Sequence, residues 1–271
     1  MKPRFIDLVI AEFKNFFTEF LRRKSLILAL IMYPYILTAL IMFIGTTFGS
    51  PEYFKQRILA DPLLFFLASS LTLLISLIII DDIGARFIWE ERMGTLQYLM
   101  LIPTSMTKLI LASPVPRLAL TSCWVIAVLA PTAIAIRGIE AGLAVVLTCL
   151  IATLGALCFI GMALIIGGLL ILSKGEWSIY SIIRPLILFA SGVFYPAALM
   201  PIWLKILSMT LPLSYAIEAS RMLIAFENPE IKLILIDIAL MTVLAILYTP
   251  LGLKTYSYLE IRTKKIGGLR T

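Results

Sequence analysis

The chain has 271 residues, of which 61% are hydrophobic and 14% are charged. A soluble domain is about half apolar and about a quarter charged, so this chain lacks the polar surface that a soluble core would need. The composition excludes an ordinary soluble domain and predicts a protein embedded in a lipid bilayer. Basic loops on one side of a membrane explain the net charge of +7, and we expect no nucleic-acid partner.

The residue content also limits the chemistry. The sequence has no histidine, which excludes Ser-His-Asp catalysis, histidine-ligated zinc and histidine proton relays within the chain. Cys123, Cys149 and Cys158 lie in apolar stretches without CxxC spacing, and we interpret them as buried small hydrophobes. No GxxxxGK[ST] motif occurs, so ATP that drives this protein must bind to another chain. We expect no catalytic residue, metal site or cofactor here.

The N-terminal residues 3–24 are predicted to form a helix that lies in the membrane interface. Apolar residues such as Ile6, Phe13 and Phe20 recur at steps of three and four, and charged residues recur on the other side. Charges run through the whole stretch, which is not typical of a cleavable signal peptide. An amphipathic helix packed on protein is the alternative.

Six apolar segments are predicted to cross the bilayer. A helix rises about 1.5 Å per residue, so roughly 20 residues cross a hydrocarbon core of about 30 Å. Pro34 is expected to kink the first segment. The segments cover residues 25–48, 62–80, 114–136, 141–172, 179–195 and 231–253.

Two interruptions of the apolar pattern are informative. Asp81 and Asp82 follow the second segment, and we expect them near the interface or facing other helices because charge is costly in hydrocarbon. Residues 196–230 are apolar but divided by four prolines into pieces too short to cross. These pieces are predicted to form two short helices that dip into the outer half of the membrane.

The predicted fold class is therefore an all-α membrane protein that forms one transmembrane domain over residues 1–271. An interfacial helix covers residues 1–24, a six-helix membrane part covers 25–253 and a basic cytoplasmic tail covers 254–271. Of the 23 Lys and Arg residues, 17 fall in the segments on the side of the two termini. Basic residues favour the cytoplasmic side, which predicts that both termini are cytoplasmic.

Residues 86–108 are the longest segment expected in the cytoplasm before the tail. Gly94 permits a turn, Thr95 is placed to cap a following helix, and Pro103 ends it. The pattern predicts a short helix over residues 96–102 below the membrane. Its apolar run YLMLI would be a sticky patch in water, which favours contact with a partner; a helix lying flat on the membrane is the alternative.

Two stretches resemble the ABC-2-type permeases, the membrane subunits of type V-like ATP-binding cassette exporters. Residues 90–112 are similar to the pattern E-R-x-x-G-T-L-(E/Q)-x-L-L-x-x-P-x-S, with one residue fewer between Arg and Gly than some members have. Residues 191–221 are similar to the stretch around the fifth helix and the outer re-entrant hairpin, although Leu211 replaces the usual Asn. The matching residues are Glu91, Arg92, Gly94, Thr95, Leu96, Gln97, Leu99, Pro103 and Ser105 in the first stretch, and Ser191, Gly192, Phe194, Pro196, Pro201, Leu207, Pro212, Leu213, Tyr215, Glu218 and Arg221 in the second.

The resemblance implies a multi-pass permease of the cell (plasma) membrane. It would work as a dimer, expected to be a homodimer, with two separate ATP-binding cassette ATPase subunits that bind ATP and Mg. The short helix after the Gly-Thr pair would be the coupling helix, which docks in a groove of the ATPase. The ATPase-coupling residues implied are Glu90, Glu91, Arg92, Gly94, Thr95, Leu96, Leu99 and Met100, and the outer re-entrant or gate residues implied are Phe194, Tyr195, Pro196, Pro212, Tyr215, Glu218 and Arg221.

The leading hypothesis is an exporter permease without enzymatic activity of its own, which forms the substrate path at a dimer interface. Charge is sparse within the spans, so we expect an amphiphilic cargo: a drug-like compound, a lipid or a lipid-linked glycan. An ion-gradient-driven secondary transporter is the first alternative, with Asp81, Asp82, Glu218 and Asp237 as its ionisable sites. A non-transporting membrane anchor or assembly subunit is the second.

Overall fold

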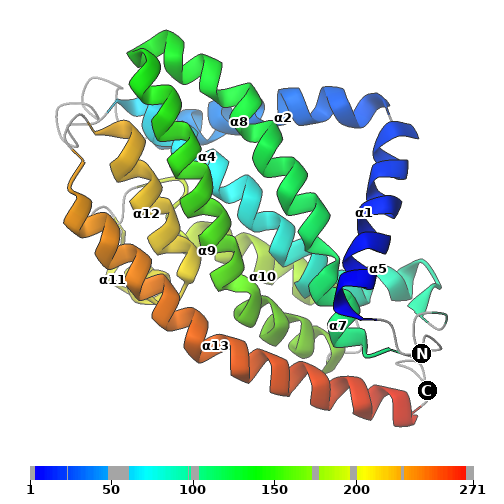
Figure 1. Cartoon of the computed structure of the whole chain (residues 1–271). Coiled ribbons are helices and arrows are strands. Elements are labelled where there is room, and N and C mark those ends of the chain that lie inside the picture. The colour runs from blue at the N-terminus through cyan, green and yellow to red at the C-terminus, as the bar shows by residue number, and fades with distance from the viewer. Residues whose placement is uncertain are drawn as a thin grey trace.

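The computed structural model describes residues 4–22, 24–47, 61–96, 98, 104–172, 177–195, 200–226 and 229–266, and over these ranges every regular element is a helix. Figure 1 shows a bundle in which α4, α8 and α9 run side by side, α2 crosses one end and α1 is set apart along one edge. The helices are α1 (Phe5–Arg22), α2 (Lys24–Thr47), α4 (Pro62–Ile79), η1 (Ile80–Gly84), α5 (Arg86–Arg92), α7 (Met106–Ala112), α8 (Pro114–Arg137), α9 (Ile139–Leu172), α10 (Trp177–Ala190), α11 (Ile202–Met209), α12 (Pro212–Ala225) and α13 (Ile231–Ile266).

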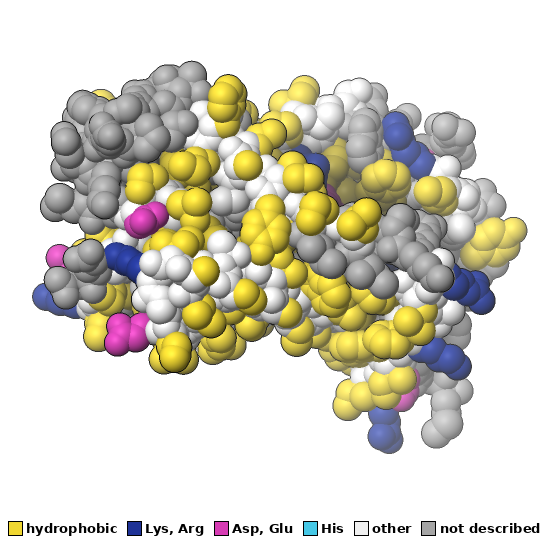
Figure 2. Space-filling model, turned by 90° about the horizontal axis from the view of Figure 1, so that it is seen from above, with side chains coloured by type: hydrophobic (Ala, Val, Ile, Leu, Met, Phe, Trp, Pro, Cys, Tyr) yellow, Lys and Arg dark blue, Asp and Glu magenta, His cyan; other side chains and the backbone are white. Residues whose placement is uncertain are grey.

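Four helical stretches in the described ranges are long and apolar enough to cross a membrane. They are Pro62–Gly84, Met106–Arg137, Ile139–Ile171 and Ile231–Leu259. This result confirms the predicted class, an all-α membrane protein. The surface agrees, because apolar side chains cover much of the face in Figure 2 and most charged side chains gather toward its two ends.

The two other predicted spans, the first and the fifth, are not among these four stretches. The first corresponds to α2, which is 24 residues long and contains Pro34; the kink expected there stays a prediction. The fifth, expected over residues 179–195, is shorter than predicted because α10 ends at Ala190 and has only 14 residues, or about 21 Å. Gly192 ends it in a left-handed turn with φ of 79°, a conformation that glycine adopts without strain.

Helix α4 forms the centre of the bundle. It contacts α2, α8, α9 and α12, and every residue from Leu64 to Ile79 is buried. Asp61 caps its first turn by accepting hydrogen bonds from the backbone N–H groups of Leu63 and Leu64, at 2.9 and 3.2 Å. Because its apolar side chains are enclosed by neighbouring helices, α4 serves as the shared core of the protein.

The segment 196–230 contains two short helices, α11 and α12, as the proline pattern predicted. Pro201 and Pro212 each stand at the start of one of them, where a missing backbone N–H costs nothing. Ten residues of α12 are buried, and α12 contacts α4, α9 and α13. The second short helix is therefore a core element of the bundle.

Helix α13 is longer than predicted. The sixth span was expected to end at residue 253, whereas the helix continues through the polar tail to Ile266. A change from apolar to polar residues marks the end of a hydrophobic surface but does not stop a helix. No glycine or proline follows residue 253 before Gly267. The start of α1 and the end of α13 lie at the same end of the bundle (Figure 1), which we call the terminal end; the opposite end is the distal end.

Helices α9 and α13 cross in backbone contact. A Cβ atom added at Gly161 would lie 2.4 Å from the backbone nitrogen of Thr249, and one added at Gly252 would lie 2.3 Å from the carbonyl oxygen of Gly161. Small residues permit this kind of close approach between membrane helices. The contact sets where the long α13 meets the bundle.

We predict that Gly161→Ala lowers stability by about 1–3 kcal/mol, because the added methyl group meets rigid backbone. The matched control is Gly142→Ala, whose Cβ would lie 2.7 and 2.8 Å from Cγ1 and Cδ1 of Ile134, a half-exposed side chain that moves aside more easily than backbone. Thermal unfolding in detergent would measure both variants. Equal melting temperatures for Gly161→Ala and Gly142→Ala would contradict the close crossing.

Candidate functional site

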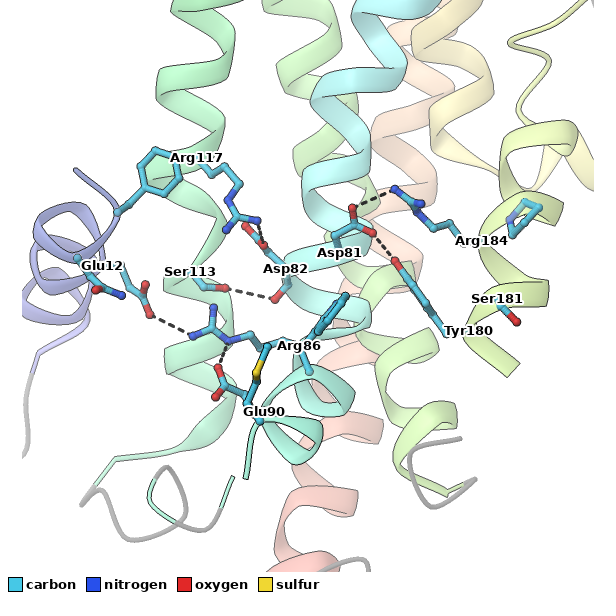
Figure 3. A pocket seen from close by; sticks show the side chains of 15 residues that line it. Glu12, Asp81, Asp82, Arg86, Glu90, Ser113, Arg117, Tyr180, Ser181 and Arg184 are labelled. Carbon is cyan, nitrogen blue, oxygen red and sulfur yellow. Dashed lines mark hydrogen bonds and ion pairs between the residues drawn. The ribbon is translucent and has the colours of Figure 1, made fainter. Parts of the chain in front are cut away.

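A widened helical turn carries two adjacent carboxylates at the terminal end of α4. The turn η1 is a π-helix over Ile80–Gly84, with the backbone N–H of Ala85 bonded to the carbonyl oxygen of Ile80 at 3.1 Å. Figure 3 shows Asp81 and Asp82 leaving this turn in opposite directions. Single π-turns of this kind are frequent at functional sites because they re-aim side chains.

Each carboxylate binds an arginine of a different helix. Asp82 accepts a hydrogen bond from Arg117 of α8 at 2.6 Å. Asp81 accepts one from Arg184 of α10 at 3.1 Å and another from the hydroxyl of Tyr180. The prediction that these acids lie near the interface or face other helices agrees with this arrangement. The pair connects α4 to α8 on one side and to α10 on the other.

A third arginine connects the same region to α1 and α5. The guanidinium of Arg86 lies 2.7 Å from Glu90 and 3.8 Å from Glu12 of α1. Arg117 also lies over the ring of Phe16 of α1, 5.6 Å from its centroid. These contacts hold the N-terminal helix against the terminal end of the bundle.

A cavity of about 970 Å³ opens among these groups. Its size is that of a pocket for a drug-sized molecule. The wall combines charged and aromatic side chains from α1, η1, α5, α8 and α10, and Figure 3 draws the lining side chains. They are Glu12, Asn15, Phe16, Asp81, Asp82, Arg86, Trp89, Glu90, Met93, Ser113, Arg117, Tyr180, Ser181, Arg184 and Pro185.

The predicted coupling residues continue from this cavity, since Glu90 lines it and Glu91 and Arg92 end α5. Gly94 adopts φ of 71°, so it makes the predicted turn. The hydroxyl of Thr95 donates to the carboxylate and the carbonyl oxygen of Glu90, which closes the preceding helix; the predicted cap of a following helix falls mostly outside the described residues. The Gly-Thr pair therefore ends α5 and redirects the chain.

The apolar residues of the coupling segment have different environments. Leu96 is only 6% exposed and packs in the core of the bundle, whereas Tyr98 is 73% exposed. Leu99 and Met100 lie outside the described residues, as does most of the predicted helix over 96–102. Of the described residues, Tyr98 rather than Leu96 offers apolar surface to a partner.

Arg221 organises the predicted gate residues at the distal end. Its side chain is fully buried and donates to the Ser69 hydroxyl at 2.7 Å and to the carbonyl oxygens of Gly192 and Val193 at 2.7 and 2.8 Å. It also lies 3.2 Å from the Glu218 carboxylate and above the ring of Phe65. Arg221 thus joins α12 and α4 to the turn that follows α10.

The other predicted gate residues lie around this arginine. The carbonyl oxygen of Tyr195 is 3.5 Å from Arg221, and the ring of Phe194 packs on Phe189. Tyr215 donates to the carbonyl oxygen of Met209, which connects α12 to α11. Pro212 begins α12, and Pro196 lies outside the described residues. The contacts among these residues connect helices and turns with one another. Arg221 joins three of these parts: α12, α4 and the turn that follows α10.

Sequence reasoning missed several residues of the cavity wall. Glu12, Arg117, Tyr180 and Arg184 were assigned to an interfacial helix or to the ends of apolar segments. The signal that could have found them is charge within apolar segments, because an arginine near the end of a span requires a carboxylate nearby. In the described ranges no group of three or more Cys, Asp or Glu side chains is arranged to hold a metal ion.

A model of the ABC-2 type transporter family matches residues 8–225, which is most of the chain. The chain therefore belongs to the ABC-2 type transporter family. The matched region includes the cavity wall, the coupling segment and Arg221. Neither a curated protein nor a solved structure gives a significant match. Membership and the apolar helices together identify a membrane-embedded permease subunit of an ATP-binding cassette transporter.

We predict that Arg221→Lys lowers stability by about 3 kcal/mol. Lysine keeps the charge but cannot reach the hydroxyl, the two carbonyls and the carboxylate with one ammonium group, so buried acceptors lose their donors. Arg22→Lys at the exposed end of α1 is the matched control. Thermal unfolding of both variants gives the comparison, and an unchanged melting temperature for Arg221→Lys would contradict its role as a hub.

Proposed function

We propose that this permease is the membrane half of an exporter, and that two copies form the substrate path between them. Two separate ATPase subunits bind ATP and Mg at the terminal end, which faces the cytoplasm, and the permease itself performs no chemistry. The observation that carries the proposal is the charge cluster at the terminal end: it connects the coupling segment to α1, α4, α8 and α10 in a chain of this family.

The contacts provide a route from the ATPase to the membrane helices. Segment 93–98 leaves α5, and Thr95 fastens it to Glu90. Glu90 binds Arg86, and the chain passes from there directly into η1 with its two carboxylates. A displacement of the coupling segment would therefore change the positions of Asp81 and Asp82 relative to their arginines. ATP would shift the balance between two arrangements of these ion pairs.

The cargo is proposed to be amphiphilic. The cavity beside α1 has the size of a drug-sized molecule and combines aromatic with charged walls. The other faces of the spans expose apolar side chains such as Leu150, Ile246 and Leu251, which suit lipid or a second permease. An amphiphile would place its polar part at the charged end of the bundle and its apolar part among the helices.

An ion-gradient-driven transporter is the competing proposal. It would use Asp81, Asp82, Glu218 and Asp237, and one carboxylate oxygen of Asp237 is buried without a hydrogen-bond donor. Asp81, Asp82 and Glu218, however, are each paired with an arginine, as structural carboxylates are. Uptake into inside-out vesicles distinguishes the two: export requires ATP, whereas a secondary transporter stops when the ion gradient is removed.

Tyr98→Asp is predicted to reduce capture of the ATPase at least tenfold while the permease stays folded, because Tyr98 is exposed at the coupling segment. Ile139→Asp is the matched control. It introduces the same charge at an exposed apolar position, beside the turn between α8 and α9 at the distal end. Co-purification from cells that express candidate ATPases of the same genome, followed by ATP hydrolysis, measures the effect. Equal capture by both variants would reject docking at this segment.

Leu96→Asp should behave differently from Tyr98→Asp. Leu96 packs in the core, so a carboxylate there lowers the melting temperature of the permease itself as well as ATPase capture. The expected loss of stability is about 2–4 kcal/mol, within the range for an unpaired polar group in a core. A permease with normal thermal stability after Leu96→Asp would show that this side chain is not a core residue.

A further inference from the structure

The cavity at the terminal end carries an excess of negative charge. Three arginines line it, and each already has a carboxylate partner: Arg117 with Asp82 at 2.6 Å, Arg184 with Asp81 at 3.1 Å and Arg86 with Glu90 at 2.7 Å. Glu12 is the fourth carboxylate of the wall, and it lies 3.8 Å from Arg86, which is closer to Glu90. The charged side chains of the lining therefore sum to one negative charge, which attracts cations.

One oxygen of this wall lacks a donor. Asp82 binds Arg117 through Oδ1, whereas its Oδ2 is buried and has no hydrogen-bond partner. The side chain of Asp82 is only 7% exposed, and the hydroxyl of Ser113 donates to the backbone carbonyl of Asp82 instead. Buried carboxylate oxygens are almost always satisfied, because a missing hydrogen bond to a charged group is costly. Protein encloses this oxygen in the structure, so a ligand with an N–H group would reach it after a movement of the neighbouring side chains.

The remaining wall fits the rest of such a ligand. Phe16, Trp89 and Tyr180 provide aromatic surface, which favours cations and apolar groups alike. The Nε–H of Arg184 is likewise enclosed by protein and has no acceptor. Phe16 belongs to the amphipathic helix α1, whose apolar side chains Ile6, Ile10 and Phe13 are exposed as membrane-facing side chains would be. The cavity thus borders the membrane surface.

We infer that this cavity binds the ammonium headgroup of an amphiphile that enters from the inner leaflet, with Asp82 as the group that accepts its N–H. This inference rests on the proposed function, in which the terminal end is cytoplasmic and the cargo is amphiphilic. The ammonium would lie between the carboxylate of Asp82 and the charge of Glu12, and the apolar part would extend past Phe16 toward the membrane. A cationic amphiphile is thereby favoured over an anionic one of the same shape.

The test uses two dyes with the same ring system and opposite charge. Rhodamine 123 is a cation with N–H groups, and fluorescein is an anion. Their binding to the purified full-length permease in a non-ionic detergent is measured by fluorescence polarisation, without an ATPase. We expect rhodamine 123 to bind at least tenfold more tightly than fluorescein, and equal affinities would overturn the inference.

Variants locate the binding. Asp82→Asn and Glu12→Gln each remove one negative charge from the wall and should weaken rhodamine 123 binding about tenfold, the size expected for one lost charge-assisted contact. Glu140→Gln, an exposed site at the start of α9, is the matched control and should change nothing. If Asp82→Asn does not fold, Glu12→Gln still tests the inference. Glu12→Gln is expected to fold because Arg86 keeps Glu90 as its partner. If both variants bind as Glu140→Gln does, the cavity is not the site.

Competition separates the sources of the ammonium group. Octylammonium should displace the dye at concentrations at least tenfold lower than ethylammonium, because its chain adds apolar contact beyond the headgroup. Equal displacement by the two would overturn the amphiphilic part of the inference. Since no ATPase is present, a permease that binds rhodamine 123 but never captures an ATPase would refute the proposed function and leave the binding site standing. The reverse result would refute only the binding site.

Discussion

Two neighbouring carboxylates at the end of a buried helix are the constraint on which the terminal end depends. Asp81 and Asp82 follow the 18 residues of α4, none of which is charged, at a place where an unpaired ion is costly. Each therefore requires an arginine, and the two arginines come from α8 and α10, which are far apart in sequence. In an ordinary α-helix adjacent side chains diverge by about 100°, and the π-turn adjusts that divergence locally so that both carboxylates meet their partners.

At the distal end the signs of the charges are reversed, because one buried cation there donates hydrogen bonds to several oxygen atoms. Arg221 binds a hydroxyl, two carbonyl oxygens and one carboxylate, and it is enclosed completely. Between these two polar centres, α4 is a continuous buried helix that touches both, through Ser69 and Phe65 at one end and through η1 at the other. A shift of α4 along its axis would affect both centres together, which makes it a physical link between the two ends of the protein.

Much of the helical layout could be predicted from the sequence, because apolar length and proline position are local signals. The approximate ends of α8 and α9 and the presence of two short helices followed from them, and Gly94 was correctly expected to turn. The length of α10 and the continuation of α13 were not predicted, since neither the turn at Gly192 nor the absence of a stop after residue 253 changes hydropathy. The cavity was not predictable either, because Glu12, Asp82, Arg117 and Arg184 meet only through tertiary packing.

The 36-residue helix α13 gives the protein a lever arm. At about 1.5 Å per residue it spans about 54 Å, well beyond a hydrocarbon core of about 30 Å. Gly252 packs against Gly161 of α9 roughly two thirds of the way along, two residues after Pro250, which removes one helical hydrogen bond. A force on the last turns would therefore travel to the distal end along one helix, and Pro250 beside the crossing is the place where that helix bends most easily.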